Sequence, residues 1–174
     1  MVSVLDALRL DAVAVAGWSL GSMVGMHLAA THPQRIDRLI LLDPPLATLD
    51  EVKLASLGKG WKRLERTYPD RATAVAAWRE SPALPSDWDD AVAAYVNADL
   101  RELPDGTIGH QVDPRVLLWE RETRVPPLTA VIPKIACPTL ILRATDPLYV
   151  AGDQLLTQAA AAQAVRTFAH ATTV

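Results

Sequence analysis

The sequence predicts an α/β fold in which a mainly parallel sheet, flanked by helices, is interrupted by an inserted and mainly helical segment. Two short apolar runs, residues 12–17 and 38–43, stand on either side of a helical pattern at 20–32. This order of strand, helix and strand is typical of parallel strands joined by a right-handed crossover. A third apolar run at 138–142 restores the strand pattern, and a helix is expected at 152–165.

Composition and charge restrict the classes of partner. Of the 174 residues, 50% are hydrophobic, so a single domain, or part of a larger one, can bury a core. The net charge is −3 and the two signs are intermixed, which predicts neither a nucleic-acid surface nor membrane binding. The single cysteine, Cys137, allows no internal disulfide, and a packing role is expected. Without a long uninterrupted apolar run, a cytoplasmic location is expected.

Signals for helix ends and turns place further elements. Ser3 is a candidate N-cap for a helix over 3–9, and Pro33 predicts that the helix after the first strand ends at His32. Asp105-Gly106 is a turn signal for joining two short strands. The final residues, "FAHATTV", predict the start of another strand.

The middle of the chain has a different character. It holds four of the five tryptophans, most of the charge and many prolines, and its apolar residues recur at helical intervals. We expect an inserted helical region whose tryptophans help to form a largely hydrophobic pocket. The expected helices are 51–68, 71–80 and 87–100. The tryptophans are Trp61, Trp78, Trp88 and Trp119.

The stretch "GWSLG", residues 17–21, stands between the first predicted strand and the helix that follows it. This spacing is the one that a strained strand-to-helix turn needs in order to raise Ser19 above the sheet. We expect that glycine is needed at positions 17 and 21, because a Cβ on Gly17 or Gly21 would collide with the chain around the serine. Gly25 continues the small-residue stripe and is expected to let the helix backbone approach the sheet closely.

Together with "HPQRIDRLILLDPP" and "CPTLILRATD", this stretch resembles the nucleophile-elbow half of an α/β-hydrolase with a cap domain. The resemblance implies three parts: residues 1–45 as the core with the elbow, 46–133 as the cap, and 134–174 as the core with the acid-bearing strand and the following helix. It also implies a serine hydrolase of carboxylic esters that works through an acyl-enzyme. Thioester, lactone and peroxidase chemistry stay open.

The resemblance implies that Ser19 is the nucleophile, that the Leu20 N–H stabilises the oxyanion, and that Trp18 lines the substrate pocket. Asp146, just beyond the strand "PTLILR", is the implied acid. The family's usual position for the acid falls one residue later, on Pro147. Asp153 and Asp43 are the alternatives: Asp153 is expected in the first turn of the next helix, and Asp43 in a turn that ends a strand.

The catalytic histidine is not placed by the sequence. His27 and His32 precede the acid, and His110 lies in the presumed cap, where a packing role is expected. By the resemblance, His170 occupies the turn before the last strand, and the base lies beyond Val174. The chain is therefore expected to be a fragment of a longer hydrolase, with little activity and with unfinished sheet edges that favour self-association.

Two classes of function stay open. One is the ester hydrolase, with a small-molecule substrate; the other is a non-catalytic α/β-hydrolase-like protein that binds a small molecule or takes part in signalling. No metal-ligand cluster and no phosphate-binding loop is found in the sequence, so no cofactor is expected.

Overall fold

The computed structural model describes residues 1–174 except 47–50, 82–83, 85–87, 114 and 116–127. It has two compact units, which we describe separately. Unit 1 is Met1–Asp50, Val125–Pro147 and Gln154–Val174. Unit 2 is Glu51–Arg124 and Leu148–Asp153. Most of the segment that we expect to be the cap, residues 46–133, falls in unit 2, although Trp119 lies outside the described residues.

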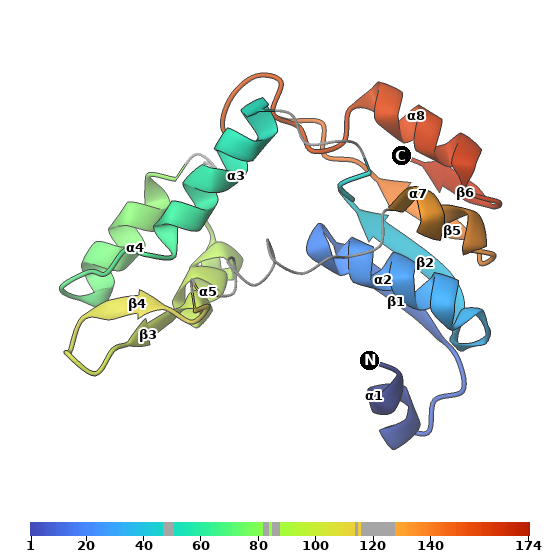
Figure 1. Cartoon of the computed structure of the whole chain (residues 1–174). Coiled ribbons are helices and arrows are strands. Elements are labelled where there is room, and N and C mark those ends of the chain that lie inside the picture. Colours follow the sequence, from blue (N-terminus) through green and yellow to red (C-terminus); the bar gives the residue numbers. More distant parts are fainter. Residues whose placement is uncertain (47–50, 82–83, 85–87, 114, 116–127) are drawn as a thin grey trace. The chain divides into compact units, whose positions relative to one another are not determined.

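Unit 1 is built on a parallel sheet of four strands in the order β1-β2-β5-β6 (Figure 1). The strands are β1 (Val13–Trp18), β2 (Ile36–Leu42), β5 (Thr139–Leu142) and β6 (Ala171–Thr173). The apolar runs of β2 and β5 form central strands, with a hydrogen-bonded neighbour on each side. The predicted fold class is confirmed, and β1 is an edge strand.

The helices of unit 1 follow their local signals with two exceptions. They are α1 (Val2–Ala7), α2 (Leu20–Thr31), α7 (Leu128–Val131) and α8 (Gln158–Thr167), with single 3-10 turns at Pro33–Arg35 and Ile132–Lys134. The expected cap at Ser3 is wrong, because α1 begins at Val2 with Met1 as its N-cap. The expected start of the last helix at residue 152 is also wrong. Thr157 is its N-cap and accepts a 3.2 Å hydrogen bond from the N–H of Ala160.

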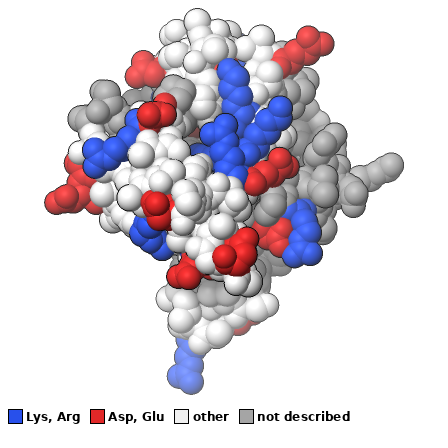
Figure 2. All heavy atoms as spheres, turned by 90° about the vertical axis from the view of Figure 1, so that its left-hand side faces the viewer, with Lys and Arg blue, Asp and Glu red and all other residues white. Residues whose placement is uncertain are grey.

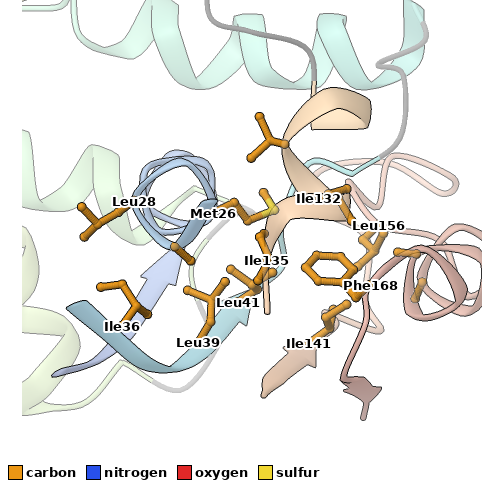
Figure 3. Packing of buried hydrophobic residues seen from close by; sticks show 14 residues of the cluster. Met26, Leu28, Ile36, Leu39, Leu41, Ile132, Ile135, Ile141, Leu156 and Phe168 are labelled. Atoms are coloured by element: carbon orange, nitrogen blue, oxygen red, sulfur yellow. The ribbon is translucent and has the colours of Figure 1, made fainter. Parts of the chain in front are cut away.

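One face of this sheet carries the core of unit 1. Side chains from α2 and α8 pack on the strands there, with Met26, Leu41, Ile141 and Phe168 among the buried residues (Figure 3). Consecutive right-handed crossovers that advance in one direction place their helices on the same face. Ile40, on the alternate face, is only partly buried.

Unit 2 contains α3 (Glu51–Arg63), α4 (Arg71–Arg79), α5 (Asp90–Asp99) and a hairpin of β3 (Leu100–Glu102) and β4 (Ile108–His110). The predicted Asp105-Gly106 turn is confirmed, with Gly106 at φ 81°. Asp70 and Asp89 cap α4 and α5 through their side chains. Trp78 is 2% exposed in this unit's own apolar cluster.

His110 has the packing role that the sequence favours. Its Nδ1 lies 2.6 Å from Oδ2 of Asp99, and its ring contacts Tyr68 and Trp78 edge-on. Its side chain is fully buried. The histidine therefore ties the hairpin to α5 inside unit 2.

Candidate active site

Ser19 lies between β1 and α2 in a backbone conformation that residues other than glycine rarely adopt. Its φ is 48° and its ψ is −112°, a conformation that costs about 1–3 kcal/mol, which the surrounding contacts must offset. The Ser19 N–H donates a 3.0 Å hydrogen bond to the Leu42 carbonyl of β2, which anchors the turn to the sheet. The Ser19 hydroxyl makes no capping hydrogen bond to α2, which is described in full. This geometry is the strained turn that the sequence predicts.

The two glycines of the turn have different roles. A Cβ on Gly17 would lie 2.2 Å from the carbonyl oxygen of Gly21, so only glycine fits there. A Cβ on Gly21 would meet nothing within 4 Å, so the expected collision at Gly21 is wrong. What matters at Gly21 is its backbone, which occupies the space beside Gly17. At Gly25 a Cβ would lie 3.0 Å from Leu39, in accord with the expected close approach of helix and sheet.

The buried Ser22 hydroxyl holds this turn by hydrogen bonds, a role that the sequence reasoning missed. Its hydroxyl is fully buried and donates a 2.6 Å hydrogen bond to the Gly17 carbonyl, with the Leu42 carbonyl 3.3 Å away. A hydroxyl three residues after Ser19, one helical turn further along, was the available signal. The turn therefore has a polar support inside the protein.

The residues on either side of Ser19 are accessible. Leu20 is the first residue of α2, where backbone N–H groups have no partner within the helix and the helix dipole is positive. Leu20 is 52% exposed, and Trp18 is 68% exposed. Trp18 therefore stands open to solvent on the edge strand in this structure.

Three candidate side chains follow the carboxyl ends of neighbouring parallel strands. Trp18 pairs with Leu42, and Leu42 pairs with Leu142, so β1, β2 and β5 end at the same level. Ser19 and Asp43 each come one residue after their strands, and Asp146 comes four residues after β5. The turn of Ser19 and both of these carboxylates therefore follow the same end of the sheet, the edge formed by the carboxyl ends of the strands.

Asp146 lies in an exposed bend, and among contacts between described residues its carboxylate has no hydrogen bond. Asp43 is held more firmly. It has φ 43°, its N–H donates to the Leu142 carbonyl at 2.7 Å, and its Oδ1 accepts from the Ala144 N–H at 3.2 Å. Burial raises the pKa of the Asp43 carboxyl, and the Ala144 hydrogen bond and the Arg143 charge only partly offset this.

Asp153 belongs to unit 2 and does not lie in the first turn of a helix, so that expectation is wrong. Its carboxylate accepts hydrogen bonds from the N–H groups of Leu148, Tyr149 and Val150 at 2.7, 2.8 and 3.0 Å. Burial raises the pKa of Asp153, but these bonds and one from Ser56 outweigh it, so the pKa lies below its usual value. Asp153 therefore organises a loop.

No histidine of unit 1 lies at the edge that carries Ser19. His27 and His32 are in the later part of α2 and just after its end. His170 directly precedes β6, and its carbonyl accepts from the Thr139 N–H at the amino end of β5. About five residue steps along the strands separate these two ends of the sheet, which is roughly 16 Å. His170 thus occupies the turn before the last strand.

The described ranges contain neither a membrane-spanning helix nor a metal-ligand cluster. None of their helices combines the length and apolar character that crossing a bilayer needs. The same ranges contain no group of three His, Cys, Asp or Glu side chains placed to hold a metal ion.

Comparison with known proteins identifies the family. A model of the alpha/beta hydrolase fold family matches residues 1–148. The chain therefore belongs to the alpha/beta hydrolase family.

Two curated relatives have names that describe ester hydrolysis. The lipase LipV of Mycobacterium tuberculosis is 30% identical over 165 residues, which cover 90% of this chain and 58% of the lipase. A pimeloyl-acyl-carrier protein methyl ester esterase of Neisseria meningitidis is 30% identical over 106 residues, which cover 59% of this chain and 36% of that esterase. The chain thus spans 58% or less of the length of these relatives.

Solved structures agree on the fold. An E-2-(acetamidomethylene)succinate hydrolase superposes with a TM-score of 0.76 at 17% identity, over 99% of this chain and 62% of that chain. An esterase of Mycobacterium tuberculosis gives a TM-score of 0.74 at 23% identity, over 99% of this chain and 57% of that chain. At these identities the likeness concerns the fold alone.

Proposed function

We propose that the protein, in its complete form, hydrolyses small carboxylic esters through an acyl-enzyme on Ser19. The observation that carries the proposal is the backbone of Ser19, which is held at φ 48° directly before the N-terminus of α2. Membership of the family and the names of the lipase and methyl ester esterase relatives support an ester as substrate.

In the proposed reaction, the Ser19 Oγ attacks the ester carbonyl carbon while its proton passes to a base. The carbonyl oxygen becomes an oxyanion that accepts a hydrogen bond from the Leu20 N–H, at the positive end of α2. The tetrahedral intermediate then expels the alcohol, which takes the proton from the base. Water, activated by the same base, attacks the acyl-enzyme, releases the carboxylic acid and restores the Ser19 hydroxyl.

The remaining roles are those of the acid, the base, the cap and the substrate pocket. Asp146 is proposed as the carboxylate that orients the base, and Asp43 is the alternative at the same edge of the sheet. Because unit 1 has no histidine at this edge, we propose that the base is a residue beyond Val174. This chain alone is then expected to have little activity. We propose the cap role for residues 46–133 and substrate contact for Trp18.

The test is covalent labelling of the full-length protein with a fluorophosphonate, followed by peptide mapping and an assay with short p-nitrophenyl esters. We expect the label on Ser19 and hydrolysis that disappears in Ser19→Ala. Ser3→Ala, which changes an exposed serine of the same unit, is the matched control. Labelling that persists in Ser19→Ala contradicts the proposal. Ester binding without labelling or turnover favours a non-catalytic binding protein.

A further inference from the structure

Unit 2 contains a cavity of about 390 Å³ that lies entirely within that unit. Its lining includes three cationic side chains, those of Lys59, Arg63 and Arg66, and one carboxylate, Glu80. Figure 2 shows Lys and Arg side chains gathered on the side of unit 2 that is turned to the viewer. The volume is in the range of small-molecule sites. The cavity thus has a local excess of positive charge on a chain whose net charge is −3.

The local sequence explains this excess. Lys59 and Arg63 are four residues apart on α3, so they share one face of the helix, and Arg66 follows just after its end. Among the residues that the structure describes, no carboxylate forms an ion pair with any of the three. These three cations are therefore available to an anion that enters the cavity.

Two residues of the lining each have a buried hydrogen-bond donor without an acceptor. The Nε of Arg63 and the Nε1 of Trp78 are buried and have no acceptor among the described atoms. Trp78 is 2% exposed, so solvent cannot readily satisfy its indole N–H. Buried donors without acceptors cost about 1–3 kcal/mol each, and a ligand oxygen would remove that cost once the side chains shift to expose them.

Aromatic rings hold the cations in place. The guanidinium carbon of Arg63 lies 3.7 Å from the centroid of the Trp78 ring, and Nζ of Lys59 lies 5.7 Å from that of Tyr149. Tyr68 also lines the cavity. Stacking of this kind fixes a guanidinium while leaving its edge free for an oxyanion. The ring of Tyr68, on which no described cation is stacked, offers an apolar surface to a flat substituent.

We propose that this cavity binds a small phosphate monoester with an aromatic substituent. Among the described residues of the lining, three cations against one carboxylate leave a formal excess of two positive charges, which a phosphate dianion matches. The proposal concerns a binding site in unit 2 and is independent of the chemistry proposed for Ser19.

The test is isothermal titration of the full-length protein with phenyl phosphate, with benzoate as the singly charged comparison. We expect saturable binding of phenyl phosphate, about tenfold tighter than that of benzoate, and weaker at higher salt. Arg63→Gln and the double variant Lys59→Gln/Arg66→Gln should each raise the dissociation constant about tenfold. Lys62→Gln removes a neighbouring exposed charge of α3 that does not line the cavity, and it should leave binding unchanged.

Near-ultraviolet circular dichroism checks that the variants remain folded. If Arg63→Gln disturbs the packing of Trp78, the double variant decides, because Lys59 and Arg66 are both exposed. Absence of saturable binding at millimolar phenyl phosphate overturns the proposal. Equal binding of benzoate, or an equal loss in Lys62→Gln, also overturns it. Since the titration requires no turnover, its outcome does not depend on the ester-hydrolase proposal.

Discussion

The backbone N–H of Ala144 donates a 3.2 Å hydrogen bond to Oδ1 of Asp43 and so ties the loop after β5 to the end of β2. Asp146 lies two residues beyond Ala144. The position of the proposed catalytic acid therefore depends on a bond accepted by the other candidate acid. A substitution at either carboxylate affects the same edge of the sheet. At Asp43 it changes the hydrogen bond with Ala144, and at Asp146 it changes the proposed contact with the base.

The first prediction separates these two carboxylates in the full-length enzyme. Asp146→Asn should lower the acylation rate by about two to four powers of ten, because an amide cannot stabilise the protonated base as a carboxylate does. Asp43→Asn should have a mild effect, since an amide oxygen can still accept from Ala144. Pre-steady-state release of p-nitrophenol measures both. A large loss confined to Asp43→Asn would move the acid to the end of β2.

The second prediction concerns stability and pH at Asp43. Because burial raises its pKa, folding favours the protonated carboxyl. The stability that this gives is complete below the ordinary pKa of 3.8 and is lost as the pH rises through the raised value. Asp43→Asn should therefore be at least as stable as the parent near pH 7, and any advantage should shrink near pH 4. Urea unfolding at both values tests this; an advantage that grows in acid contradicts it.

The third prediction concerns the loop that Asp153 organises. Asp153→Ala leaves the N–H groups of Leu148, Tyr149 and Val150 without their acceptor, at a cost of about 2–4 kcal/mol. Because the pKa of Asp153 is lowered, its contribution is present above 3.8 and is lost as the pH falls through the lowered value. The difference from the parent in urea unfolding should shrink in acid. Asp146→Ala, at an exposed site, should change stability little.

The fourth prediction uses the two glycines of the serine turn as a matched pair. Gly17→Ala would place a Cβ 2.2 Å from the Gly21 carbonyl oxygen, and we expect a loss of about 3 kcal/mol or more. Gly21→Ala meets nothing within 4 Å and lies in a helix, so it should be neutral or stabilising by up to about 1 kcal/mol. Thermal unfolding compares them. Equal losses would show that the turn is not as tightly packed as described.

The fifth prediction concerns the 174-residue chain by itself. We expect almost no turnover of p-nitrophenyl acetate, because no histidine of unit 1 lies near Ser19 to remove its proton. We also expect self-association, since β1 is an edge strand with the apolar sequence "AVAVA" at residues 12–16. Light scattering and the ester assay test both expectations. Steady turnover that is lost in both Ser19→Ala and His170→Ala would identify His170 as the base.

The sequence was sufficient for features that depend on local chemistry. The apolar runs predicted β1, β2 and β5, and the glycine spacing predicted the strained turn at Ser19. Features that depend on contacts between distant residues were not predictable. The loop that Asp153 binds takes shape only in the fold, and so does the bond between Ala144 and Asp43. The four-residue spacing of Lys59 and Arg63 on α3 can be read from the sequence. It did not stand out there, because positive and negative residues are intermixed along the chain.

Strands β2 and β5 are hydrogen-bonded neighbours, although residues 43–138 separate them along the chain. Closing a flexible loop costs only about 0.6 kcal/mol more for each doubling of its length, so this insertion weakens the sheet little at equilibrium. Its effect on folding rate is larger, because distant pairings form slowly. The segment β1, α2 and β2 is able to fold early through local contacts. We expect strand β5 to join later, together with Asp146, which follows it by four residues.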